Sequence, residues 1–224
     1  MTEVPHTSQE FEQNLNALAE HLVQMGTRAE HQVERAMKAV IERDDAIADA
    51  VIAGDAAINA DENDIDAEAL QLLARYQPLA ADLRFVAMCL KAVIDIERIG
   101  DLAVDTARRA HELNRIQAPA WHFDLQSLAM SVTRALRAVL ACVRGKDAEG
   151  AEQVLQETLQ IEQVYARRLA ELLAHVATDP ATITWVLPLT SVCRYLGRIG
   201  DYVRNLAGQV IYMVRAEHVR YVGS

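Results

Sequence analysis

The stretch Ile96-Glu-Arg-Ile-Gly-Asp101 returns as Leu196-Gly-Arg-Ile-Gly-Asp201, 100 residues further along the chain. The same offset pairs residues well outside these stretches, for example Glu62 with Glu162. Self-similarity at one fixed offset indicates that a chain contains two copies of one structural unit. We therefore expect a duplicated architecture, in which each copy is centred on a helix face that carries acidic residues.

The composition favours long helices over β-structure. Aromatic residues make up 5% of the 224 residues, and the chain has only 9 glycines and 5 prolines. This length is enough for one large domain or two small ones. The formal net charge of -10 argues against binding to nucleic acid, which requires a basic surface, and is compatible with binding to cations or to a basic partner.

Apolar residues recur at steps of three and four along most of the chain, and no strand pattern is present. We predict an all-α protein of two three-helix bundles, the first at 7–114 and the second at 123–217, joined by a linker at 115–122 that contains Pro119. Short turns favour antiparallel neighbours within each bundle. The expected helices span approximately 7–43, 44–77, 78–114, 124–144, 146–177 and 180–217.

Acidic residues gather on the third predicted helix and on the second. The third carries three acids at four-residue spacing, which places their side chains on one face, and the second carries two acids at that spacing with an amide one turn earlier. These residues are Glu97, Asp101, Asp105, Glu62, Asp66 and Asn59. Like charges at this spacing destabilise a helix by about a few tenths of a kcal/mol per pair unless a cation neutralises them. If the two faces meet, their oxygen atoms suit Mg²⁺, Mn²⁺, Ca²⁺ or iron.

The same spacing is also common on solvated helix faces, where nearby arginines such as Arg98 would serve as counterions. Two further observations bear on the choice. The acidic face recurs in the second copy, and Gly100 and Gly200 lie inside helices at a cost of about 1 kcal/mol each relative to alanine. A close approach of two helices would explain both glycines, with or without a metal.

The second copy of the face is thinner. Three acids of the first copy are replaced, by Gly197, Ala166 and Asn205. Glu162 and Asp201 remain as carboxylates, and Asn205 can offer a neutral oxygen. If both copies bind metal, we expect the first to bind it more tightly.

Other kinds of site find less support. Cys89, Cys142 and Cys193 lack a metal-ligand or redox spacing, and we interpret them as small buried residues in a reducing compartment. The predicted helices contain no Glu-x-x-His pair, and the chain contains no glycine-rich phosphate loop and no GxSxG. No export signal and no run of the length of a spanning helix is visible, so we expect a cytoplasmic protein that reaches a membrane only through partners.

The stretch Asp95-Ile-Glu-Arg-Ile-Gly-Asp101 resembles the signature of the PhoU family, an acid-x-x-x-Asp motif that occurs once per half. The resemblance continues at Val51-Ile-Ala-Gly-Asp55 and at Gln77-Pro-Leu-Ala-Ala-Asp-Leu-Arg84. In the second half, Arg194-Tyr-Leu-Gly-Arg-Ile-Gly-Asp201 is similar to the paired motif. Several motifs in the same order and spacing make the resemblance specific.

The resemblance implies two three-helix bundles related by pseudo-symmetry, with metal on the two motifs in some members. The ion could be Mg, Mn, Fe or Zn. Gly197 departs from the pattern, which expects an acid there. Carried over to this chain, the acidic positions of the family pattern, with the polar residues of the next turn, are Glu62, Glu97, Asp101, Asp105, Glu162, Asp201 and Asn205.

The function implied by the resemblance is negative regulation of the phosphate regulon and of phosphate uptake. Such a protein is expected to act as a non-enzymatic adaptor between the ATPase subunit of the phosphate ABC transporter and a sensor histidine kinase, and to form a homodimer. Two alternatives remain open. One is a metal-dependent hydrolase that uses metal-activated water, for which the sequence offers no nucleophile or general-base histidine; the other is a metal-free helical scaffold.

Overall fold

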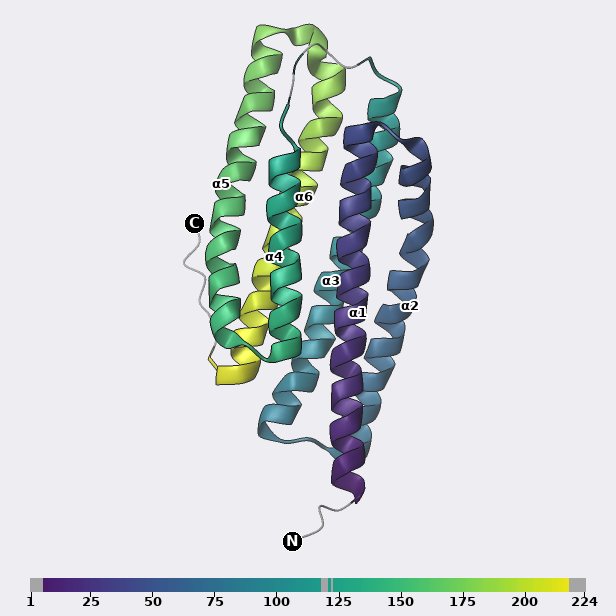
Figure 1. Ribbon diagram of the computed structural model, residues 1–224, viewed down its shortest axis with the longest axis vertical. Coiled ribbons are helices and arrows are strands. Elements are labelled where there is room, and N and C mark those ends of the chain that lie inside the picture. The colour runs from purple at the N-terminus through teal and green to yellow at the C-terminus, as the bar shows by residue number, and fades with distance from the viewer. Residues whose placement is uncertain (1–5, 118–120, 122, 218–224) are drawn as a thin grey trace.

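In a computed structural model, the chain is described at residues 6–117, 121 and 123–217, with the backbone alone at 6–8. These residues form six α-helices and a short 3₁₀ turn, with no strand among them, which confirms the all-α prediction (Figure 1). The elements are α1 His6–Glu42, α2 Asp45–Tyr76, α3 Ala80–Asn114, α4 Gln126–Gly145, α5 Ala148–Thr178, η1 Pro180–Thr182 and α6 Ile183–Arg215.

Two aspartates fix helix starts. The Asp44 carboxylate accepts hydrogen bonds from the first backbone N–H groups of α2, and Asp147 accepts one from the N–H of Gly150 at the start of α5. Each satisfies donors that have no partner inside the helix. The turn after α4 differs from the expectation, because Gly145 remains helical and the left-handed residue is Lys146, with φ 50°.

Several other helix ends also differ from the expected ones. Pro78 lies before α3 rather than in its first turn, α4 begins two residues later than expected, and α6 ends at Arg215. The expected last helix is divided, because Pro180–Thr182 forms a 3₁₀ turn before α6 begins. Part of the expected linker, at 118–120 and 122, lies outside the described residues.

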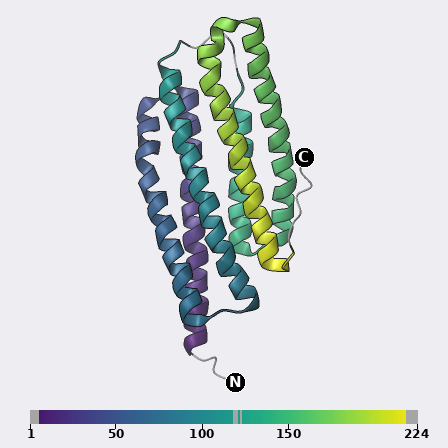
Figure 2. The same cartoon turned by 180° about the vertical axis from the view of Figure 1, so that it is seen from behind.

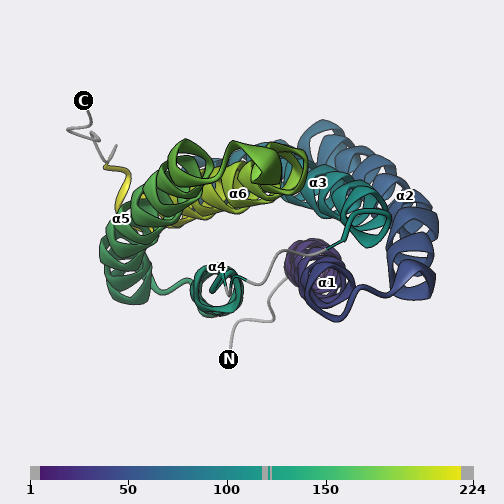
Figure 3. The ribbon, with the colours of Figure 1, turned by 90° about the horizontal axis from the view of Figure 1, so that it is seen from above.

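The six helices form two layers, as the view from above shows (Figure 3). Helices α5, α6, α3 and α2 make a curved row, and α1 and α4 lie side by side on its concave side. Each half is a trio of neighbouring helices, and the halves meet twice, where α3 packs on α6 and where α1 packs on α4. The view from behind shows α3 and α6 next to each other (Figure 2).

The buried apolar side chains of both halves form one continuous cluster. Polar contacts also join the halves. Arg137 on α4 binds the buried carboxylate of Glu30 on α1, with 2.7 Å between Nε and Oε1. On the other interface, Nε2 of Gln209 on α6 donates to Asp95 on α3 at 2.7 Å. The division into two domains at 7–114 and 123–217 stays a prediction.

The three cysteines are buried and unbonded to one another, as expected. Burial raises the pKa of Cys89 and of Cys193 to about 12, which keeps both thiols protonated. In the described part of the chain, none of the helices combines the length and the apolar character needed to cross a membrane.

Candidate functional site

Two helix pairs approach closely at equivalent glycines. A Cβ atom added to Gly100 on α3 would lie 2.9 Å from Cδ1 of Ile58 on α2, and one added to Gly200 on α6 would lie 3.0 Å from Cγ2 of Ile161 on α5. A side chain at either position would therefore crowd the isoleucine opposite, which would have to shift. The expected close approach is confirmed in both halves, and it brings α2 against α3 and α5 against α6 beside the acidic residues.

Four carboxylates gather along α2 and α3, and Glu97 lies at their centre. This side chain is only 17% exposed. Burial raises the pKa of Glu97, the neighbouring Asp101 carboxylate raises it further, and Glu62 and Asp55 on α2 add to the shift, while Arg98 opposes it. Three carboxylates, from both helices, thus act on the largely buried carboxyl group of Glu97.

One arginine offsets part of this charge. Nη1 of Arg98 lies 3.1 Å from Asp101, and Nε lies 3.5 Å from Glu97. On α2, Asn59 donates a hydrogen bond to Asp55 at 3.1 Å. We call Asp55, Glu62, Glu97 and Asp101 the first acidic face; its negative charge exceeds the charge of the arginine beside it.

Asp105, the third acid of the predicted series, makes a different contact. It pairs with Arg108 one turn along α3, with 2.9 Å between Nη1 and Oδ1. Asp66 is half-buried on α2. The charges that act most on the pKa of Glu97 are those of Asp101, Arg98, Glu62 and Asp55.

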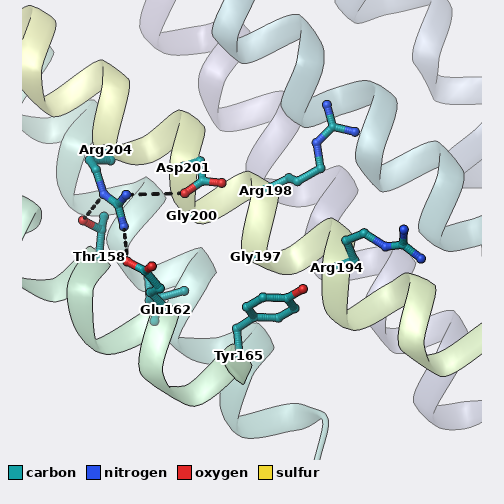
Figure 4. A pocket seen from close by; sticks show the side chains of 10 residues that line it. Thr158, Glu162, Tyr165, Arg194, Gly197, Arg198, Gly200, Asp201 and Arg204 are labelled. Atoms are coloured by element: carbon teal, nitrogen blue, oxygen red, sulfur yellow. Dashed lines mark hydrogen bonds and ion pairs between the residues drawn. The ribbon is translucent and has the colours of Figure 1, made fainter. Parts of the chain in front are cut away.

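The second face, on α5 and α6, is arranged around Arg204 (Figure 4). Its guanidinium lies 3.1 Å from Glu162 through Nη2 and 3.6 Å from Asp201 through Nη1. Nε donates to the hydroxyl of Thr158 at 3.2 Å. Partial desolvation raises the pKa of Asp201, and Arg204 opposes that shift. A side-chain cation therefore lies between the two carboxylates that we predicted as metal ligands.

A pocket of about 160 Å³ lies beside these residues. Gly197 opens it, because the ring of Tyr165 lies 3.2 Å from where a Cβ would be. Figure 4 shows Arg194 and Arg198 extending from α6 on the side of the pocket away from Glu162.

Asn205 does not join the second face. Burial raises the pKa of Asp95 on α3, and the side-chain amides of Gln209 and Asn205 oppose that shift, which places Asn205 beside Asp95. Asn205 therefore contributes to the interface between the halves, beside Gln209.

Two residues of these faces were missing from the predicted set. Asp55 precedes Glu62 by two helical turns, a spacing that places both on one side of α2. Arg204 stands where the first copy has Val104. Both signals are visible in the sequence once the two copies are aligned residue by residue.

Comparison with known proteins assigns the chain to a family. The model of the PhoU domain matches residues 22–110 and again residues 125–210. The chain belongs to the PhoU family. The two matches correspond to the two copies found in the sequence, and together they include both faces.

Members of the PhoU family are similar over nearly the whole chain. The chain is 39% identical to a homologue of the phosphate-specific transport system accessory protein PhoU from Pseudomonas putida, covering 97% of this chain and 86% of that protein. The corresponding Pseudomonas aeruginosa homologue is 38% identical, covering 97% and 90%. The accessory protein PhoU from Escherichia coli (strain K12) is 31% identical with the same coverage of 97% and 90%.

Solved PhoU structures have the same fold. The crystal structure of PhoU from Pseudomonas aeruginosa matches with a TM-score of 0.88 at 37% identity, over 92% of this chain and 100% of that one. The phosphate transport system regulatory protein PhoU from Streptococcus pneumoniae matches with a TM-score of 0.87 at 24% identity, over 94% and 99%. The second match supports the fold alone.

The first acidic face fits the kind of metal site that the PhoU resemblance implies. Its ligand atoms would be carboxylate oxygens, which hard divalent cations prefer, and Glu97 is a largely buried carboxyl group whose pKa is raised first by that burial and then by the neighbouring carboxylates. The second face fits poorly, because Arg204 already lies between Glu162 and Asp201 and position 197 is a glycine. Among the described residues, no three His, Cys, Asp or Glu side chains are grouped closely enough to hold an ion as they stand.

Proposed function

We propose that this PhoU-family protein is an accessory regulator of phosphate transport that restrains phosphate uptake and keeps the phosphate regulon off. The observation that carries the proposal is the match of both copies to the PhoU domain together with relatives named as phosphate-specific transport accessory proteins. Its role is that of a non-enzymatic adaptor in the cytoplasm, and its assembly is a homodimer.

The partners in this proposal are the ATPase subunit of the phosphate ABC transporter and a sensor histidine kinase. The adaptor meets the membrane through these partners. A net charge of -10 gives it an acidic surface, which favours basic segments on the partner proteins.

We further propose that Mg, Mn, Fe or Zn binds at the first acidic face, held by Glu97, Asp101, Glu62 and Asp55. The bound ion would supply positive charge between α2 and α3. The four carboxylates would hold the ion, and Arg98, which is half exposed, pairs with Asp101 and Glu97. With its like charges neutralised, the α2–α3 pair gains rigidity, and it is this ordered surface that a partner meets.

The proposal is tested by Glu97→Gln/Asp101→Asn, which keeps the shape of both side chains and removes their charge. We expect the variant to lose the metal bound by the wild type, measured by elemental analysis of protein purified without chelator. In cells that carry no other copy of the gene, we expect a phosphate-responsive reporter to stay on when phosphate is plentiful.

Asp64→Asn is the matched control, because Asp64 is an exposed acid on α2 outside the first acidic face. It should keep both metal and repression. Full repression by the metal-free variant would contradict a role for metal and favour a metal-free scaffold. Loss of repression by Asp64→Asn as well would indicate a general effect of surface charge.

A further inference from the structure

We propose that Arg204 takes the place of the metal ion in the second half, so that the α5–α6 face is neutralised by a side chain and binds no metal. This inference rests on the proposed function, because it assumes that the first acidic face binds metal. The carboxylates of the first acidic face would then be neutralised by a metal ion and those of the second face by an arginine, although the helices are arranged in the same way.

The position of Arg204 carries the inference. The residue is 22% exposed, and its guanidinium contacts Glu162 on α5 and Asp201 on α6. A metal ion shared by these helices would have to be held by the same two carboxylates. The arginine thus bridges the helix pair through the charges that an ion would bridge.

The hydrogen-bond acceptors around Arg204 suit a guanidinium group. Thr158 accepts from Nε at 3.2 Å and donates its own proton to the carbonyl of Leu155 at 2.7 Å. A planar guanidinium with donors in a fixed fork suits acceptors on several sides, whereas a hydroxyl that is already committed adds little to a divalent ion.

The first half has no counterpart of this arrangement. Residues 104 and 58, which correspond to Arg204 and Thr158, are Val104 and Ile58, and both are buried and apolar. No side chain at position 104 can therefore supply a cation to the first acidic face. Conversely, the first half has Glu97 and Asp55 where the second has Gly197 and Leu155.

The replacements are mutually consistent. Compared with the first acidic face, the second face has two carboxylates fewer and an arginine between the two that it has, which is what a face independent of metal requires. A metal ion at Glu162 and Asp201 would also lie next to the Arg204 charge, and repulsion between like charges opposes its binding.

The experiment isolates the second face by using Glu97→Ala/Asp101→Ala as the background and Mn²⁺ as the probe. Metal content after dialysis is measured for this background, and again with Glu162→Ala/Asp201→Ala added. We expect both proteins to hold no Mn²⁺ and to be indistinguishable. Mn²⁺ that stays in the background and disappears with the added substitutions would overturn the proposal.

A gain of binding provides the second arm. In the same background, Gly197→Glu/Arg204→Val gives the second face the residues that the first has at those positions. We expect it to bind about one Mn²⁺ per chain, with at least about tenfold higher affinity than Gly197→Glu alone, which keeps the arginine. Circular dichroism and gel filtration establish that each variant is folded.

The outcomes separate this inference from the proposed function. Equal affinity of folded Gly197→Glu and Gly197→Glu/Arg204→Val would show that Arg204 does not exclude metal, and would overturn the inference. If wild type binds no Mn²⁺, the metal role in the proposed function fails, while the gain-of-binding arm still decides the role of Arg204. Arg204→Val with Gly197 retained is the milder variant if the double substitution does not fold.

Discussion

The first acidic face, on α2 and α3, and the second face, on α5 and α6, are built on equivalent helix pairs, but different cations lie beside their carboxylates. In both, a glycine lets the helices approach, and two acids at equivalent positions, Glu62 and Asp101 or Glu162 and Asp201, flank the contact. In the first, four carboxylates have Arg98 beside them. In the second, two carboxylates have Arg204 between them. The duplicated helices place carboxylates at the same positions in both halves, whereas single substitutions decide which group neutralises them.

The largest expected effect is on stability, and it tests the close helix approach that both halves share. Gly100→Val and Gly200→Val should each lower the free energy of unfolding by about 1–3 kcal/mol, because a branched side chain would overpack against Ile58 or Ile161. Urea denaturation measures both.

Gly197→Ala is the control for these substitutions. The half-buried Tyr165 ring beside it can shift, and alanine favours the helix by up to about 1 kcal/mol, so stability should rise or stay unchanged. A large loss at Gly197 and none at Gly100 would show that the close approach has been assigned to the wrong turn.

A smaller effect separates the two arginines. Arg204→Met should lower the free energy of unfolding by about 1 kcal/mol, and Arg98→Met by less, because Arg204 is the less exposed arginine and joins carboxylates on two helices, whereas Arg98 pairs with neighbours on its own helix. Denaturation at low and high ionic strength checks this, and the Arg98 effect should diminish more with salt. Equal losses with equal salt dependence would remove the distinction between the faces.

The smallest effect concerns the pH dependence of the metal-free protein. Below the ordinary pKa of 4.5, Glu97 is protonated in both the folded and the unfolded states. As the pH rises from there through its raised folded pKa, the unfolded state releases the proton first, so the folded state loses stability.

Glu97→Gln removes this loss. Its stability relative to wild type should therefore increase from about pH 4.5 upward and level off once the pH exceeds the raised folded pKa of Glu97, by about a few tenths of a kcal/mol. Denaturation in chelator across this range provides the measurement. A difference that does not change with pH would mean that Glu97 titrates normally in the folded protein.

Much of the fold follows from sequence because its determinants are local. The repeat at one offset gives two copies, the apolar spacing gives the helices, and glycines inside helices point to close approach. Local signals fail at the ends. Gly145 suggests a turn by its conformational freedom, yet the chain continues one residue further and turns at Lys146.

The candidate site is less predictable because it depends on how helices face one another. Four-residue spacing places Asn205 with Asp201, but α6 lies between α5 and α3, and Asn205 reaches Asp95 on the other neighbour. Asp55 joins the first acidic face because α2 passes α3 in a register that spacing alone does not specify. By contrast, Glu97 and Asp101, the acids closest to Gly100, lie together on one face of α3, as their four-residue spacing predicts.

The continuous core has a consequence for unfolding. Because buried side chains from all six helices pack into one cluster, neither trio can lose its packing without exposing the other, and the chain should unfold in a single cooperative transition. An ion bound to α2 and α3 alone would then raise the melting temperature of the whole protein, including the half that holds none.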